Sequence, residues 1–225
     1  MSEETRLLYL EGIEGSYLRE AEVEVRGYEN GGYVLSQTMM HYQGGGQPGD
    51  NGFLASGETK IPVYNVKKKG QKVLHLSRTS PDISQGKLVV NWERRYGIMK
   101  MHTLQHAISS VIFKEGFMTM KSEVFPGYGF IEMDKALTDI PDGAYRLNES
   151  DRNVRRFAIK KEEMDPQVLK RCNLEKLPKS LTEISMVEID GLDLCACAGT
   201  HLRNTLEIGK YWLRGMGRRL EFGLF

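Results

Sequence analysis

The sequence predicts an α+β fold in two parts. A small β-barrel-like domain with a glycine-rich motif is expected over residues 1–85, and a domain that combines a β-sheet with packed helices over residues 86–225. Apolar and polar residues alternate with a period of two in the first part, as in half-buried strands. A polar stretch with proline and glycine, residues 79–87, then interrupts the pattern. Beyond it, apolar residues recur at helical spacing.

The first part reads as short strands separated by turn residues. Such strands, with turn signals at this spacing, are typical of small barrels and sandwiches. A run of lysines, residues 67–69, followed by Gly70 is expected to form the tip of a hairpin. The expected strands lie within residues 20–28, 31–42, 52–57 and 60–78.

One long helix is expected at residues 93–117, where apolar residues at helical offsets predict a single buried stripe. A second helix is expected over residues 165–177, with Pro166 near its start. Residues 184–199 read as strand, turn, and strand or loop. Residues 207–222 read as two strands around a glycine-rich turn.

Composition narrows the class of protein. The net charge of +1 means that any nucleic-acid surface is a local patch. The N-terminus lacks the plan of a signal peptide, and no apolar run approaches the about 18 residues of a membrane span. Three cysteines argue against a disulfide framework and for a reducing compartment. We therefore expect a cytoplasmic protein with no membrane segment, and no obligatory protein partner is evident.

Two histidines, His102 and His106, are four residues apart within the expected long helix. Residues at this spacing share a helix face, with Cβ atoms about 5–6 Å apart, which suits two imidazoles that bind one metal. A zincin protease would need glutamate after the first histidine, and that residue is Thr103. The alternatives are a metal site of another kind and two histidines on a polar helix face.

A second pair, Cys197 and His201, has the same spacing far downstream. The two pairs together would supply the nitrogen and sulfur donors that zinc most often takes. Cys195 competes with Cys197, because residues i and i+2 face the same way in an extended segment. Spacing alone leaves both cysteines open as ligands.

The segment "HYQGGGQPGDNG", residues 41–52, is unusually rich in glycine. A phosphate-binding P-loop would need lysine and serine or threonine after its glycines, and this segment has none of them. One alternative is a hairpin turn with a bulge. The other is close approach of backbone to a ligand or domain, because three successive glycines lose much entropy on ordering.

Four segments now point to a family. "GGGQPGDNG", "VNWERRYGIMKMHTLQH", "CAGTHLRNTLEIG" and "GRRLEF" occur in the order found in alanyl-tRNA editing domains. The sequence resembles these domains over residues 38–222, and its length and glycine run look like the medium-sized, free-standing AlaX type. It lacks the activation domain of alanyl-tRNA synthetase, so the resemblance implies an editor that acts in trans. Residues 121–134 match the family pattern poorly, and no residue is assigned to the choice of amino acid.

The resemblance implies one zinc ion per chain, bound by His102, His106, Cys197 and His201. Residues 86–225 would be the editing domain, which hydrolyses the ester of tRNA-Ala that carries serine, and also glycine. The general base is unassigned, and zinc either acts in catalysis or positions the substrate. Candidate substrate-binding residues are Gly45, Gly46, Gln47, Thr103 and Thr200.

Arginines near the expected metal site are candidates for contact with tRNA phosphates. They are Arg94 and Arg95, before the histidine pair, and Arg155 and Arg156 in a basic stretch. Two other functions remain alternatives. One is a tRNA-binding module with a structural zinc and no hydrolytic activity, and the other is a zinc hydrolase of small-molecule esters.

Overall fold

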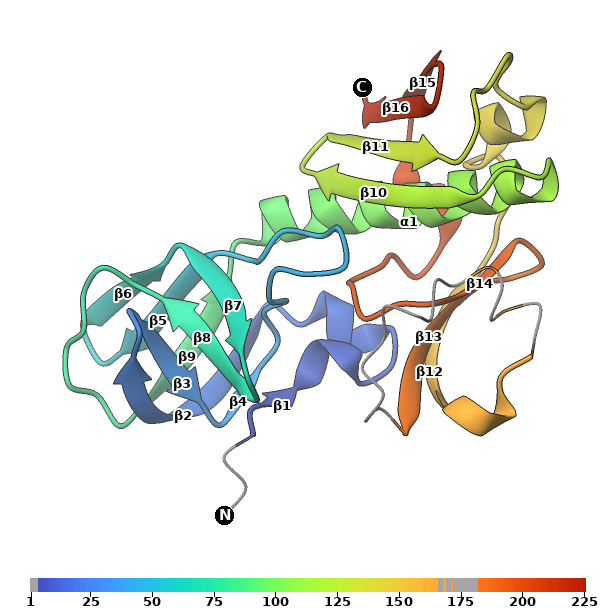
Figure 1. Cartoon of the computed structure of the whole chain (residues 1–225). Helices are drawn as coiled ribbons and strands as arrows, with labels where there is room; N and C mark the ends of the chain where they lie inside the picture. The colour runs from blue at the N-terminus through green and yellow to red at the C-terminus, as the bar shows by residue number, and fades with distance from the viewer. Residues whose placement is uncertain (1–3, 166–167, 169–170, 172–181) are drawn as a thin grey trace. The chain divides into compact units, whose positions relative to one another are not determined.

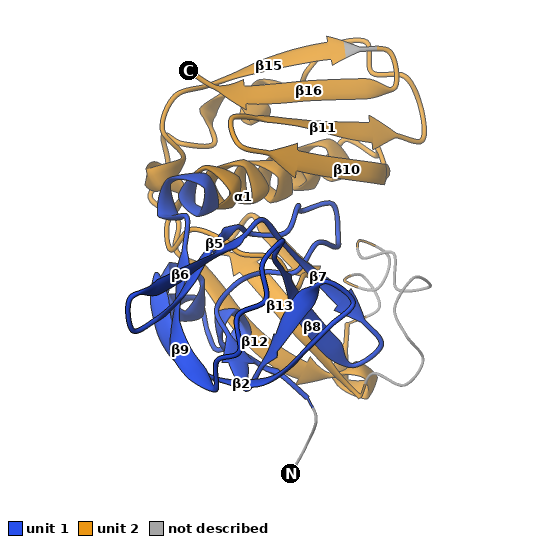
Figure 2. Ribbon diagram, turned by 90° about the vertical axis from the view of Figure 1, so that its left-hand side faces the viewer, with its two compact units in different colours: residues 1–96 blue, residues 97–225 orange. Residues whose placement is uncertain are grey.

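The computed structural model describes residues 4–165, 168, 171 and 182–225 (Figure 1). The chain divides into two compact units, residues 1–96 and residues 97–225 (Figure 2). Sheets and one long helix make up most of the described residues, which confirms the predicted α+β class. Unit 1 extends beyond the predicted boundary at residue 85, because the strand that begins there pairs with two strands of unit 1.

Unit 1 is built around a seven-stranded sheet in the order β6-β5-β9-β2-β3-β8-β7. The edge strands β6 and β7 are consecutive in the chain and separated only by Tyr64, so the sheet curls until its two edges approach each other. No ladder joins β6 to β7 in the described residues, so the predicted barrel is not closed by pairing. The strands are β2 (Glu20–Glu29), β3 (Gly32–Leu35), β5 (Gly52–Ser56), β6 (Thr59–Val63), β7 (Asn65–Lys69), β8 (Lys72–Leu76) and β9 (Gln85–Val90).

Strand β2 pairs with β9 along its first half and with β3 along its second half. A register shift between Val25 and Gly27 interrupts the β2–β3 ladder, as a β-bulge does when a strand bends. The predicted hairpin tip at Gly70 is confirmed, with the positive φ of 62° that a tight turn requires. The smaller elements of unit 1 are β1 (Arg6–Leu7), β4 (Gln37–Thr38), η1 (Leu8–Leu10) and η2 (Glu14–Tyr17).

The predicted long helix is confirmed as α1 (Trp92–Lys114). Asn91 caps its start, with its side chain accepting from the Arg94 N–H at 3.3 Å. Gly116, at a φ of 81°, stands just past its end, where a left-handed residue terminates many helices. The prediction of a single buried stripe on this helix is wrong, because residues 101–110 are buried on every side of it.

Two sheets of unit 2 flank α1. Ser109 accepts a hydrogen bond from Thr119 of one sheet at 3.2 Å, and Ser110 donates to the Leu192 carbonyl beside the other. One sheet has the order β10-β11-β16-β15 and the other the order β12-β13-β14. Their strands are β10 (Thr119–Phe125), β11 (Tyr128–Met133), β15 (Tyr211–Met216), β16 (Arg219–Leu224), β12 (Val154–Lys160), β13 (Glu183–Ile189) and β14 (Asp193–Ala196).

The hairpins expected within residues 184–199 and 207–222 are confirmed. The helix expected over residues 165–177 falls largely outside the described residues. Short 3-10 helices complete unit 2, namely η3 (Asp142–Arg146), η4 (Lys161–Glu163) and η6 (Thr205–Ile208). None of the described helices has both the length and the apolar character needed to cross a membrane.

Candidate metal centre

Four side chains from two distant segments meet within unit 2. His102 and His106 lie one turn apart on α1, Cys197 directly follows β14, and His201 lies between that strand and η6. The four potential ligand atoms all lie within 4.8 Å of one another. Cys195 is not in this group, so the fold chooses between the two cysteines that spacing left open.

The distances in this cluster suit zinc. Cys197 Sγ lies 3.3 Å from His201 Nε2 and 3.7 Å from His102 Nε2. In a tetrahedral zinc site, with Zn–N of about 2.0–2.1 Å and Zn–S of about 2.3 Å, such atoms lie about 3.5 Å apart. Three imidazole nitrogens and one thiolate are also a donor set that zinc accepts. The four residues therefore fit one zinc ion.

The charges in the cluster favour the metal-binding forms of two ligands. Burial raises the pKa of the Cys197 thiol, but the neighbouring imidazoles outweigh burial and hold this pKa well below its usual value. Burial and the proximity of His102 keep the pKa of His201 well below its usual value. Thiolate and neutral imidazole are the forms that bind metal.

The pKa of His106 shifts in the opposite direction to that of His201. Burial lowers the pKa of its imidazole, but the Cys197 thiolate and a hydrogen-bonded carboxylate, Asp193, raise this pKa to about 9. A metal ion and a proton therefore compete for His106, because a histidine ligand must bind the metal in its neutral form.

Two of the histidines are oriented through the ring nitrogen that faces away from the cluster. His106 Nδ1 lies 2.9 Å from Asp193 Oδ2, and His201 Nδ1 lies 3.2 Å from Thr103 Oγ1. Thr103 Oγ1 also accepts from the Leu202 N–H at 3.0 Å. Such partners fix the tautomer of a metal-binding histidine and leave Nε2 to face the metal. Thr103 thus positions His201, and its predicted contact with the substrate stays a prediction.

Sequence reasoning missed Asp193, the first residue of β14. Its side chain is buried, and its second oxygen, Oδ1, lies 3.2 Å from an Arg171 guanidinium nitrogen. The available signal was a carboxylate shortly before Cys197. That signal is weak, because aspartate is common in turns such as the one that precedes β14.

Arg156, a candidate for tRNA contact, instead holds the loop that carries Cys197. Its guanidinium donates to the Ser185 hydroxyl at 2.6 Å, to the Cys197 carbonyl at 3.0 Å, and to the Gly199 carbonyl. Only 7% of Arg156 is exposed, so it does not offer its charge to a phosphate. Among other predicted residues, Arg155 is exposed and pairs with Glu188 at 2.9 Å.

Thr200, predicted to orient a ligand or to contact the substrate, is fully buried beside His201. Its predicted role stays a prediction.

In unit 1, the glycine-rich segment contains a tight turn. Gly44 and Gln47 exchange two backbone hydrogen bonds of 3.0 Å around Gly45 and Gly46. The φ angles of these central glycines are 59° and 81°, as a two-residue hairpin loop of the common type requires. The hairpin alternative is therefore confirmed for this turn, and Gln47 is 2% exposed.

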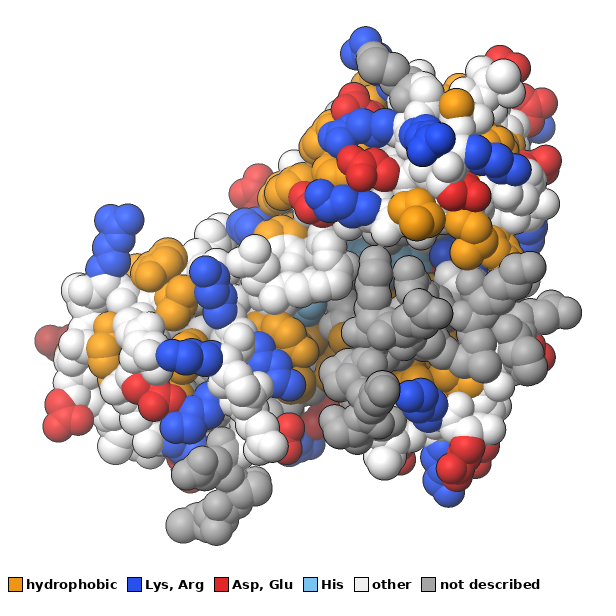
Figure 3. Space-filling model, in the orientation of Figure 1, with side chains coloured by type: hydrophobic (Ala, Val, Ile, Leu, Met, Phe, Trp, Pro, Cys, Tyr) orange, Lys and Arg blue, Asp and Glu red, His pale blue; other side chains and the backbone are white. Residues whose placement is uncertain are grey.

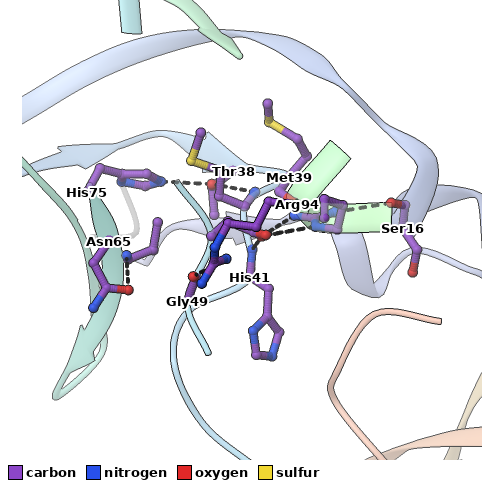
Figure 4. Close-up of polar contacts among 12 residues, drawn as sticks. Ser16, Thr38, Met39, His41, Gly49, Asn65, His75 and Arg94 are labelled. Carbon is purple, nitrogen blue, oxygen red and sulfur yellow. Dashed lines mark hydrogen bonds and ion pairs between the residues drawn. The ribbon is translucent and has the colours of Figure 1, made fainter. Parts of the chain in front are cut away.

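Arg95 anchors this segment rather than reaching a tRNA. Its guanidinium donates to both oxygens of Asp50, which in turn accepts from the His41 N–H at 2.6 Å. It also donates to the carbonyls of Ser16 and Met39, which are labelled in Figure 4. Arg95 is 0% exposed, so a phosphate has no access to it.

Its neighbour Arg94 acts in the same way at the other side of the segment. It is half-buried and donates to the Gly49 carbonyl at 2.9 Å (Figure 4). Both arginines at the start of α1 thus support the glycine-rich segment within unit 1.

Part of unit 2 matches a known protein family. Residues 184–213, which include Cys197 and His201, match the family described as threonyl and alanyl tRNA synthetase second additional domain. The chain is 32% identical over 209 residues to an alanine–tRNA ligase of Ignicoccus hospitalis. That match covers 87% of this chain and 23% of the ligase.

Alanyl-tRNA editing proteins match as well. The AlaX-L protein of Pyrococcus horikoshii is 29% identical over 204 residues, which cover 86% of this chain and 50% of that protein. The AlaX-M protein of Methanosarcina mazei is 30% identical over 219 residues, which cover 85% of this chain and 84% of that protein. The chain thus spans only part of the ligase and of the AlaX-L protein, but most of the AlaX-M protein. With its histidine and cysteine pairs brought to one point by the fold, the chain belongs to the AlaX family of alanyl-tRNA editing proteins.

Proposed function

We propose that this chain is a zinc-dependent hydrolase that acts in trans on tRNA-Ala charged with the wrong amino acid, serine or glycine. The observation that carries the proposal is the convergence of His102, His106, Cys197 and His201 in a member of this family. The printed names of the AlaX relatives describe alanyl-tRNA editing, and the tRNA-Ala substrate is carried over from them.

The residues of this chain would hold the ion in a fixed place. Asp193 orients His106, Thr103 orients His201, and Arg156 fixes the loop of Cys197. A zinc ion bound there would supply a Lewis acid for the ester carbonyl and lower the pKa of water.

Gln47 with Gly45 and Gly46 remain the proposed contacts for the aminoacyl end, together with Thr103 and Thr200. Serine differs from alanine by one hydroxyl group. A site that hydrogen-bonds this hydroxyl leaves a polar group unpaired when alanine binds, so correctly charged tRNA would be spared.

The test is a deacylation assay with seryl-, glycyl- and alanyl-tRNA for alanine, with the zinc content of each protein measured in parallel. Wild type should hydrolyse the seryl ester and spare the alanyl ester. Cys197→Ala should lose both zinc and activity, and Cys195→Ala, the matched control, should keep both. A seryl ester whose half-life does not change on addition of wild type would refute the proposal. Normal zinc in Cys197→Ala would refute the ligand assignment.

One observation favours a second candidate function, a tRNA-binding module with a structural zinc. Four protein ligands complete a tetrahedral shell, as in structural zinc sites, whereas catalytic sites usually keep one position open. In that case wild type would bind tRNA without hydrolysing any ester, and chelation would unfold unit 2. A chelated protein that stays folded but no longer deacylates would exclude this alternative.

A further inference from the structure

Unit 1 carries a group of basic side chains to which the metal centre gives no role. We call it the basic surface, and it consists of Lys60 on β6, Lys67, Lys68 and Lys69 on β7, and Arg78 shortly after β8. All five are exposed, and so is Tyr64 between β6 and β7, at 53%. Figure 3 shows Lys and Arg side chains gathered over this part of unit 1, with hydrophobic side chains among them.

The five cations of the basic surface share the lack of a carboxylate partner. Among the described residues, no ion pair involves a member of the basic surface. Lys69 donates to a neutral group, the Asn30 side chain, at 2.9 Å. By contrast, Lys87 pairs with Glu20 at 3.1 Å. The basic surface can therefore bind an anion without first breaking an ion pair.

Aromatic rings lie among the cations. The Lys60 ammonium is 3.8 Å from the centroid of the Phe53 ring, and the Arg78 guanidinium carbon is 5.9 Å from that of Tyr64. Cations interleaved with rings that can stack on bases are typical of surfaces that bind nucleic acids. An acidic protein partner would be matched by charge alone and would not need the rings.

The spacing on β7 also suits a phosphate backbone. Val66 is fully buried, so Lys67 and Lys69 leave the strand on the opposite face. Two residues on one face of a strand are about 7 Å apart, of the order of the spacing between successive phosphates of a nucleic-acid strand. Neighbouring lysines on this strand can thus contact neighbouring phosphates.

We propose that the basic surface binds the phosphate backbone of the tRNA substrate. The inference rests on the proposed function, because that function makes tRNA the partner. It also replaces the arginines suggested by the sequence, since Arg95 and Arg156 are buried and Arg155 pairs with a carboxylate. A competing explanation is that lysines on an edge strand such as β7 only prevent pairing with another sheet.

The test compares two triple variants that each remove three positive charges. K67Q/K68Q/K69Q alters the basic surface and keeps the stems of the side chains. R6Q/K87Q/K121Q, the matched control, removes cations that are paired with carboxylates. Binding of uncharged tRNA-Ala is measured at several salt concentrations, and hydrolysis of a seryl ester of adenosine is measured separately.

K67Q/K68Q/K69Q should bind tRNA about tenfold more weakly, because it loses contacts to phosphates. Its log affinity should also fall less steeply with log salt concentration, by about 0.7–0.9 in slope for each lost contact. The control should bind as wild type does, and the adenosine ester should be hydrolysed equally by all three proteins. Unchanged tRNA affinity in K67Q/K68Q/K69Q overturns the inference, and self-association of this variant would then support the edge-strand explanation. Wild type that binds anionic lipid vesicles but not tRNA would also overturn it.

The binding measurement separates this inference from the proposed function. Uncharged tRNA has no ester, so lysine-dependent binding can be observed even if wild type hydrolyses nothing. Conversely, hydrolysis without lysine-dependent binding would keep the proposed function and reject the basic surface.

Discussion

His106 Nδ1 lies 2.9 Å from Asp193 Oδ2, and this contact joins α1 to the start of β14 across 87 positions of the sequence. The carboxylate faces the ring nitrogen that does not point into the cluster, as in the carboxylate–histidine–metal arrangement of many zinc proteins. One hydrogen bond thus sets both the tautomer and the orientation of His106.

Asp193→Asn should weaken zinc binding by about 10- to 100-fold, because it removes the charge that orients His106 and supports its basicity. Competition with a chromophoric chelator measures the affinity. Asp190→Asn, in the same hairpin but paired with Arg155 at 3.4 Å, is the control and should bind zinc as wild type does. Equal zinc affinity in the two variants would show that Asp193 does not position the ligand.

Arg156→Ala should destabilise the protein by about 2–4 kcal/mol, because it leaves the Cys197 and Gly199 carbonyls without their donor in a largely buried place. Its neighbour Arg155 makes exposed ion pairs, so Arg155→Ala should cost no more than about 1 kcal/mol. Urea unfolding gives both values. Similar costs for the two substitutions would contradict the role of Arg156 as the support of the Cys197 loop.

Arg95→Ala should cost about 3–5 kcal/mol in the unfolding of unit 1, since it leaves the Asp50 carboxylate buried without its charge partner. Arg94→Ala removes one hydrogen bond from a half-buried side chain and should cost about 1 kcal/mol. Urea titrations in a Trp212→Phe background, in which Trp92 is the remaining tryptophan, report on unit 1. If Arg95→Ala were as stable as Arg94→Ala, the anchoring of the glycine-rich segment would have to lie elsewhere.

His75 should make the stability of unit 1 depend on pH. Its Nδ1–H donates to the Tyr33 carbonyl at 3.2 Å, so Nε2 is the acceptor of the Thr38 hydroxyl at 2.8 Å and the ring is neutral. Figure 4 shows the contact between His75 and Thr38. Burial lowers the pKa of His75 to about 4. In the unfolded chain the ring takes up a proton near pH 6.5, so this contribution is complete above pH 6.5 and is lost as pH falls towards 4.

The expected loss is about 2–3 kcal/mol between pH 7.5 and pH 4.5. Urea unfolding at both pH values, in wild type and in His75→Gln, measures it, because the difference between the two proteins cancels all other titrating groups. A glutamine variant with the same pH dependence as wild type would show that His75 is not the group responsible.

Much of the fold could be predicted from local pattern. The alternation within residues 20–28 and the helical spacing after Asn91 depend only on near neighbours, and β2 and α1 follow them. Strands β10, β11 and β12 were not predicted. The short, mixed sequences of β11 and β12 gain their structure from the ladders to β16 and β13, which lie far away in the chain, and β10 pairs with β11.

The sequence by itself determined the two halves of the metal centre. Each half is a pair four residues apart, His102 with His106 and Cys197 with His201. This spacing does not depend on how the rest of the chain folds. Only the tertiary structure decided what surrounds them, including the choice of Cys197 over Cys195. It also turned two predicted tRNA contacts, Arg95 and Arg156, into buried supports and added Asp193. The physical reason is that burial and hydrogen-bond partners depend on segments far apart in the chain, which no local pattern records.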